Sequence, residues 1–184
     1  MIIETIFSTL DKAGNPNFAP MGIEWDEGAV IVRPFRTSQT FRNLQSSGCG
    51  VANMSDNVLA FVRCALYKEV LPSFPAIAIR GSVFRDTCSW VELAVDSGGG
   101  TEERAEFRCR ILHRGRQKDF LGICRAKNAV IESAILGTRL AIHGRQKALE
   151  FLSQYVKIVE KAGSEEDKEA FKLVCDFVEK QGGQ

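Results

Sequence analysis

Residues 33–44, RPFRTSQTFRNL, gather the side chains of this sequence that are best suited to hold a phosphate. Arg33 and Arg36 come just before a predicted short helix, and Thr37, Ser38 and Thr40 crowd its first turn. A helix N-terminus has unpaired N–H groups and a partial positive charge, so anions bind there readily. Arginine and hydroxyl side chains add hydrogen bonds to phosphate oxygens. A second interpretation fits the same residues: Thr37 or Ser38 only caps the helix, and the arginines are solvated.

Other familiar reactive sites have little support. The sequence contains no GxGxxG and no GxxxxGK[ST] motif, so neither a Rossmann nor a P-loop nucleotide site is predicted. Its six cysteines form no CxxC pair, and only two histidines could join them at a metal, so no metal site is predicted. Most of these cysteines lie in apolar runs, where a thiol behaves as a small hydrophobe. We therefore assign no catalytic residue.

The composition is that of an ordinary globular protein. Of 184 residues, 45% are hydrophobic and 26% charged, with a formal net charge of +1. This balance argues against nucleic acid as the main partner, because phosphate-backbone binding usually requires a basic excess. No run approaches the roughly 18 apolar residues of a membrane helix. The first residues do not resemble a signal peptide, so we expect a cytoplasmic protein with free thiols.

The elements that must position residues 33–44 are mostly strands. Strands are predicted over 2–9, 18–25, 29–35, 49–54, 76–84 and 89–97, and short helices over 37–48 and 57–67. The segment 96–103, DSGGGTEE, is predicted to be a flexible connection because it holds three consecutive glycines.

The segment 103–115 shows the clearest strand pattern. Ala105, Phe107, Cys109 and Ile111 alternate with Glu106, Arg108, Arg110 and Leu112, which predicts one apolar face and one mostly charged face. The arginines could form a nucleic-acid surface, but the balanced charge favours the solvated face of an antiparallel sheet.

The last third is predicted to be helical. Helices are predicted over 125–143 and 146–162, and a third is predicted to begin after Ser164, which can cap it. Many short strands followed by helices indicate an α+β protein, with a closed or nearly closed β-barrel and a C-terminal helical segment.

Four segments in order carry a resemblance to a known superfamily. NFAPMGIEW, AVIVRPF, RTSQTFRNL and GVANMSDN resemble the FMN-binding split-barrel proteins, which include flavoredoxin-like flavin reductases and pyridoxamine-phosphate-oxidase-like proteins. Within that superfamily the chain looks closest to an uncharacterised, largely archaeal family. Members of that family carry a helical C-terminal region with a segment similar to RAKNAVIESAILGTRL.

The resemblance implies a fold and a set of site residues. It implies an antiparallel split-barrel domain over 1–124 and a helical region over 125–184, packed on or beside the barrel. It implies that FMN is the cofactor, although a deazaflavin or haem replaces it in some relatives. The residues implied to contact FMN are Met21, Gly22 and Ile23 at the ring, Arg36, Thr37, Ser38 and Thr40 at the phosphate, and Asn53 at the polar edge of the ring.

Three functions follow as expectations. The first is an FMN-dependent oxidoreductase or flavin reductase of unknown substrate, with NAD(P)H or a redox protein as partner. The second is a flavin-binding module or electron carrier without turnover. The third is an interaction protein that binds no flavin. The resemblance also implies a homodimer.

A stripe of polar residues on the predicted helix 125–143 has two possible interpretations. Arg125, Asn128, Glu132, Arg139 and His143 fall on one side at about 100° per residue. A solvent-exposed face is the favoured interpretation. The alternative is that Glu132 and Arg139 help to define a substrate pocket near the flavin.

Overall fold

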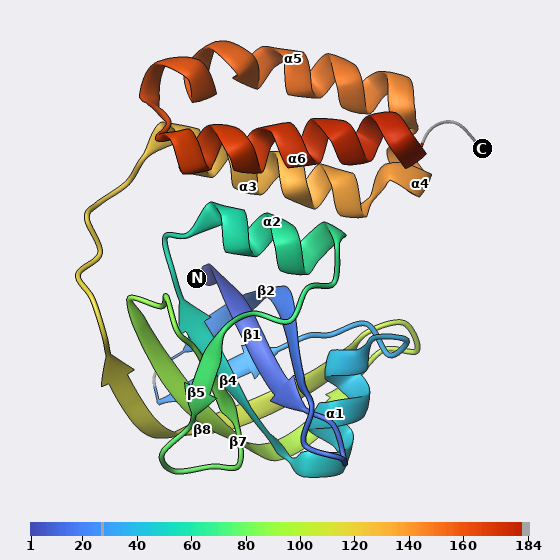
Figure 1. Ribbon diagram of the computed structural model, residues 1–184. Helices are drawn as coiled ribbons and strands as arrows, with labels where there is room; N and C mark the ends of the chain where they lie inside the picture. Colours follow the sequence, from blue (N-terminus) through green and yellow to red (C-terminus); the bar gives the residue numbers. More distant parts are fainter. Residues whose placement is uncertain (27, 182–184) are drawn as a thin grey trace. The chain divides into compact units, whose positions relative to one another are not determined.

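The computed structural model describes residues 1–26 and 28–181 and divides into two compact units (Figure 1). The barrel unit comprises Met1–Ser55 and Val70–Phe120, and the helical unit comprises Asp56–Glu69 and Leu121–Gln184. The predicted boundary at residue 124 kept residues 56–69 with the barrel, whereas the structure groups them with the C-terminal helices.

Six strands of the described chain close into an antiparallel barrel in the order β1-β2-β3-β8-β7-β4. Their bounds are Ile2–Leu10 (β1), Pro16–Asp26 (β2), Ala29–Val32 (β3), Cys49–Met54 (β4), Ser89–Gly100 (β7) and Ala105–Arg116 (β8). Helix α1, Gln39–Ser47, follows β3, and β5 (Ser73–Pro75) pairs with β6 (Ser82–Phe84) in a separate small sheet. The predicted α+β class, with an antiparallel barrel and C-terminal helices, is confirmed.

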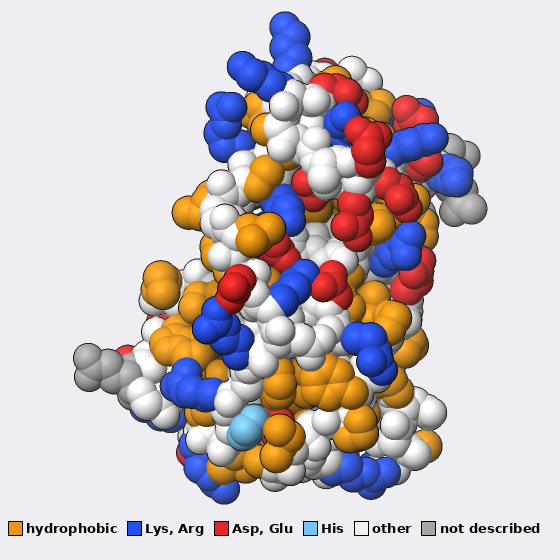
Figure 2. Space-filling view, turned by 60° about the vertical axis from the view of Figure 1, so that its left-hand side comes forward, with side chains coloured by type: hydrophobic (Ala, Val, Ile, Leu, Met, Phe, Trp, Pro, Cys, Tyr) orange, Lys and Arg blue, Asp and Glu red, His pale blue; other side chains and the backbone are white. Residues whose placement is uncertain are grey.

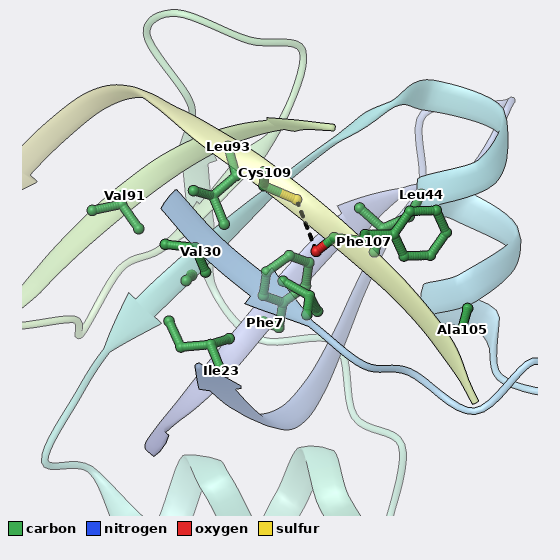
Figure 3. Packing of buried hydrophobic residues seen from close by; sticks show 11 residues of the cluster. Phe7, Ile23, Val30, Leu44, Val91, Leu93, Ala105, Phe107 and Cys109 are labelled. Carbon is green, nitrogen blue, oxygen red and sulfur yellow. Dashed lines mark hydrogen bonds between the residues drawn. The ribbon is translucent and has the colours of Figure 1, made fainter. Parts of the chain in front are cut away.

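Alternating side chains of the strands fill the barrel (Figure 3). Phe7, Val30 and Leu93 are fully buried there, and the Cys109 thiol donates to the Phe107 carbonyl oxygen at 3.8 Å. On β8, Ala105, Phe107 and Cys109 are buried while Arg108 and Arg110 are exposed, so the predicted alternation is confirmed. Burial of such apolar surface is the main favourable contribution to folding, at roughly 25 cal/mol per Å².

The structure corrects two predictions within the barrel unit. Of the strand predicted over 76–84, only Ser82–Phe84 forms, because residues 76–81 make a loop. The segment predicted to be flexible, 96–103, instead extends β7 to Gly100, which pairs with Ala105 on β8. Gly100 has φ +103, and a Cβ atom there would stand 2.3 Å from the Arg104 carbonyl oxygen, so the tight turn requires glycine.

The helical unit contains α2 (Val58–Leu66), α3 (Arg125–Thr138), α4 (Leu140–His143), α5 (Arg145–Ala162) and α6 (Glu165–Gln181). Helix α2 packs against α3 and α6. The predicted helix 125–143 is interrupted at Arg139, which has φ −113 and ψ 20. The predicted cap at Ser164 forms: Ser164 Oγ accepts from Asp167 N at 3.2 Å, and Asp167 Oδ2 accepts from Ser164 N at 2.9 Å. None of the described helices is long and apolar enough to cross a membrane.

Candidate functional site

The segment that joins β3 to α1, residues 33–38, lies along the end of the β7–β8 hairpin. We call it the β3–α1 loop, and we call residues 99–104 the hairpin tip. Phe35 forms an isolated antiparallel bridge with Arg104. Arg36 N donates to the Glu103 carbonyl at 3.0 Å, and Ala105 N donates to the Pro34 carbonyl at 3.0 Å. Backbone hydrogen bonds therefore fix the loop and the tip to each other.

The Arg36 side chain strengthens this connection. Its Nε donates to the Thr101 carbonyl at 2.7 Å and its Nη2 to the Gly99 carbonyl at 3.2 Å. The guanidinium also lies over the Phe41 ring, with Cζ 5.4 Å from the ring centroid. One edge of the guanidinium thus binds the hairpin tip.

The three hydroxyl residues have different surroundings. Ser38 caps α1, since its Oγ accepts from Phe41 N at 3.1 Å. Thr37 is exposed, one residue before the cap. Thr40 is buried, and its Oγ1 accepts from Asn17 Nδ2 on β2 at 3.2 Å. The first turn of α1 holds no acidic side chain, so nothing there offsets the positive end of the helix dipole.

Arg33, the first residue of the loop, is paired with acids, whereas Arg104 of the hairpin tip forms no described ion pair with an acid. Arg33 forms ion pairs with Glu24 and with Glu106, the latter at 2.9 Å. Hydrogen bonds to Glu24 and then to Glu106 raise the pKa of Arg33. The Arg104 guanidinium lies on the Phe35 ring, with Cζ 3.8 Å from the centroid, and its Nη1 donates to the Arg33 carbonyl at 3.2 Å.

Arg104 is not among the residues predicted from the sequence to contact FMN. Its position two residues before Glu106 continues the alternating pattern of the 103–115 strand and predicts that its side chain points outward from the barrel.

The residues predicted to lie at the flavin ring occupy β2. Ile23 is fully buried inside the barrel, and Met21 packs against the same core. Gly22 lies between them on the other face, where a Cβ atom would stand 3.0 Å from Ile2 Cγ2 and 3.1 Å from Glu4 Oε1. Gly22 therefore contributes only backbone atoms to this face of the strand. The Asn17–Thr40 hydrogen bond holds β2 beside α1, so this strand and the β3–α1 loop are neighbours.

Asn53 does not join these residues. It is fully buried on β4, which β1 separates from β2. Its Nδ2 donates to the Ile6 carbonyl at 2.8 Å and to Ser8 Oγ at 3.2 Å, and its Oδ1 accepts from Phe84 N at 2.9 Å. These bonds use its amide within the protein interior, where it links the barrel to β6.

Three buried or partly buried cysteines hold thiols that are unreactive at neutral pH, and the described residues offer no metal site. Burial raises the pKa of Cys64 and of Cys109 to about 12, and that of Cys175 to about 11, so these thiols stay protonated at neutral pH. No group of three or more His, Cys, Asp or Glu side chains in the part of the chain that the structure describes could hold a metal ion.

The two charged surfaces noted in the sequence are solvated. All five residues of the polar stripe are exposed: Arg125, Asn128, Glu132, Arg139 and His143. The interruption at Arg139 divides them between α3 and the residues that follow it. On β8, Arg108 pairs with Asp26 at 3.7 Å and Arg110 pairs with Asp96. Basic and acidic side chains are likewise interspersed over the helices (Figure 2).

Comparison with models of protein families identifies the family to which the chain belongs. Residues 3–118 match the N-terminal domain of the protein of unknown function DUF447, and residues 124–176 match a second DUF447 segment. The chain belongs to the DUF447 family. The predicted relationship to the FMN-binding split-barrel proteins is confirmed at the level of family and fold. No curated protein matches this DUF447 chain.

Solved structures resemble the DUF447 chain over different lengths. An FMN-bound DUF447 protein from Methanosarcina mazei is 26% identical, with a TM-score of 0.84 over 96% of this chain and 94% of that one. Flavoredoxin of Desulfovibrio vulgaris (Miyazaki F) is 16% identical, with a TM-score of 0.53 over 63% and 70%. The styrene monooxygenase flavin reductase of Pseudomonas putida S12 is 12% identical, with a TM-score of 0.52 over 61% and 77%. The last two share the fold alone.

The donors around the β3–α1 loop fit a phosphate monoester. The loop offers the exposed Thr37 hydroxyl and the start of a nine-residue helix, and Arg104 lies against the preceding Phe35. Helix N–H groups, hydroxyls and guanidinium groups are the donors that phosphates bind in proteins.

Proposed function

We propose that this DUF447 protein binds FMN, with the phosphate at the β3–α1 loop and the ring beside Met21 and Gly22 on β2. The observation that carries the proposal is the similarity, over nearly the whole chain, to an FMN-bound member of the same family. The donor set of the loop supports it independently. Of the phosphate residues expected from the sequence, the proposal keeps Thr37 and Ser38 at the phosphate, and it keeps Arg36 as a residue of the surrounding loop that is bound to the hairpin tip.

The other expected contacts have a different role in the proposal. Ile23, Thr40 and Asn53 are buried, and their side chains pack or form hydrogen bonds inside the barrel unit. Thr40 connects α1 to β2, and Asn53 connects the barrel to β6. They support the site and do not contact the cofactor in this proposal.

We further propose an oxidoreductase or flavin reductase that receives electrons from NAD(P)H or from a redox protein. Bound FMN would supply hydride and single-electron chemistry, and the chain would supply binding and orientation. The protein is proposed to be a cytoplasmic homodimer. The alternative is an electron carrier without turnover. The loop favours that alternative in one respect: residues 33–38 include no His, Cys, Asp or Glu that could act as an acid or base.

An absorption spectrum of the purified protein tests the cofactor. We expect the two visible bands of an oxidised flavin, and mass spectrometry of the group released on denaturation should give the mass of FMN. A deazaflavin or haem would be recognised by its spectrum. A colourless protein that does not quench FMN fluorescence at micromolar concentration would contradict the proposal.

Two further measurements test the proposed reductase activity and the proposed dimer. Oxidation of NADH or NADPH by the FMN-loaded protein, at a rate above that of free FMN, distinguishes a reductase from a carrier. Light scattering after size exclusion gives the oligomeric state, and a mass near 20.4 kDa would contradict the dimer.

A further inference from the structure

The hairpin tip and the β3–α1 loop behave as one structural element. Five hydrogen bonds join the loop to the tip and to Ala105, the residue after it. Two are between backbone groups, at Arg36–Glu103 and Ala105–Pro34, two run from the Arg36 guanidinium to carbonyls of the tip, and one runs from Arg104 Nη1 to the Arg33 carbonyl. Any ligand held by the loop is therefore held next to the tip as well.

Arg36 and Arg104 are the arginines of this element that form no ion pair with an acid among the described residues, and the Arg104 guanidinium makes the fewer hydrogen bonds of the two. One face of the Arg104 guanidinium rests on Phe35, and only Nη1 has a described hydrogen bond, to a carbonyl oxygen. A guanidinium stacked on a ring is fixed in its plane, which lowers the entropy lost on binding an anion. Arg33, by contrast, is shared by Glu24 and Glu106.

Arg36 is engaged in a different way. Its Nε and Nη2 groups form one of the two edges through which arginine can bind phosphate with two parallel hydrogen bonds, and both groups donate to carbonyls of the tip. Moving that edge to a ligand would leave the Thr101 and Gly99 carbonyls without this donor and release the tip.

We propose that Arg104, at the hairpin tip, is the arginine that recognises the phosphate of the flavin, and that Arg36 is a positioning residue that holds the tip in place. This inference rests on the proposed FMN binding. It assigns the selectivity for FMN over riboflavin to a residue outside the β3–α1 loop.

Titration of the full chain with FMN and with riboflavin, followed by fluorescence quenching, tests the assignment. Arg104→Ala should raise the Kd for FMN about 10-fold or more, where a 10-fold change equals about 1.4 kcal/mol, and leave the Kd for riboflavin unchanged. Arg110→Ala is the matched control: it removes the same charge from an outward position of β8 that pairs with Asp96. It should change neither Kd. Arg104→Lys keeps the charge without the plane and should give a smaller loss for FMN.

Hydrogen exchange of the flavin-free protein tests the role of Arg36 without any ligand. The Thr101 N–H donates to the Arg104 carbonyl at 2.8 Å in the turn of the hairpin tip. Arg36→Ala should speed exchange of this amide at least several-fold, and Arg110→Ala should not. Unchanged exchange in Arg36→Ala would overturn the positioning role.

The two proposals fail in different ways. If the unmodified protein prefers FMN to riboflavin and Arg104→Ala keeps that preference, the assignment of Arg104 is overturned and FMN binding stands. If Arg104→Ala and Arg110→Ala reduce FMN affinity equally, general charge explains the effect and the assignment again fails. If the unmodified protein binds neither flavin, the proposed function fails and the assignment fails with it.

Discussion

The Ser38 hydroxyl oxygen accepts a hydrogen bond from Phe41 N at 3.1 Å, so the cap of helix α1 is also a member of the candidate phosphate loop. Both interpretations of the sequence thus apply to one residue. Because capping needs only an acceptor, an aspartate at this position would preserve the cap. It would also add a negative charge where the phosphate is proposed to bind.

Substitutions of Ser38 should therefore separate stability from binding. Ser38→Ala should lower the free energy of unfolding by about 1 kcal/mol. Ser38→Asp should retain that stability but weaken FMN, because like charges about 4 Å apart repel by about 1–4 kcal/mol, while riboflavin should be unaffected. Urea denaturation and fluorescence titration give the two quantities. Equal FMN affinity in Ser38→Asp and the unmodified protein would contradict a phosphate at this helix end.

Replacement of Asn53 should affect folding and not flavin selectivity. Asn53→Ala leaves the Phe84 N–H and the Ile6 carbonyl without this partner, and we expect a loss of about 2–5 kcal/mol in the free energy of unfolding. Asn128→Ala, at an exposed position of α3, is the control and should stay within about 0.5 kcal/mol. The ratio of the FMN and riboflavin Kd values should not change in the folded variant. A changed ratio of the two Kd values would indicate that Asn53 contributes to flavin binding.

The buried Glu92 carboxylate should make stability depend on acid pH. Burial alone would raise its pKa, but hydrogen bonds from Ile77 N, Ala78 N and Trp90 Nε1 outweigh burial, so its pKa lies below the ordinary value. A group with a lowered folded-state pKa contributes stability above its unfolded-state pKa of about 4.3, and that contribution is lost as pH falls through the folded-state pKa.

Glu92→Gln tests this dependence. The amide should be less stable by about 1–3 kcal/mol at pH 7, because its NH₂ group faces backbone N–H donors. Urea unfolding between pH 7 and pH 3 should show a shallower acid decline than in the unmodified protein. Parallel declines would show that other carboxylates account for the dependence.

Two glycines on paired strands should tolerate alanine very differently. A Cβ atom at Gly115 would stand 2.1 Å from the Trp90 ring, and the rigid indole would have to move. We expect Gly115→Ala to cost about 1–3 kcal/mol. Gly99→Ala is the control, since nothing lies within 4 Å of its Cβ position. Thermal unfolding by circular dichroism compares them, and similar melting temperatures would contradict the close packing of Trp90 on Gly115.

Local pattern was sufficient for features that depend on near neighbours. The alternation of Ala105, Phe107 and Cys109, and the caps at Ser38 and Ser164, could be predicted because each involves residues within a few positions. The role of Asn53 could not, because its partners Ile6 and Phe84 lie 47 and 31 residues away. The same reason hid the contact between Phe35 and Arg104.

The loop 76–81 shows the same limit within a single segment. Its residues suit a strand, yet two of its N–H groups donate to Glu92, 15 and 14 residues further along the chain. These N–H groups bind a buried carboxylate instead of a neighbouring strand, and the residues around 76–81 contain no pattern that predicts this distant partner.

Helix α2 determines how this protein can be divided. Eight of its nine residues are buried, and it belongs to the helical unit although strands of the barrel precede and follow it in the chain. The backbone therefore passes between the two units three times. A gene fragment that ends before α3 would encode α2 without the helices α3 and α6 that cover it, and a fragment that begins at α3 would lack α2. Either fragment would expose the apolar surface at which α2 meets α3 and α6, and we expect such fragments to aggregate.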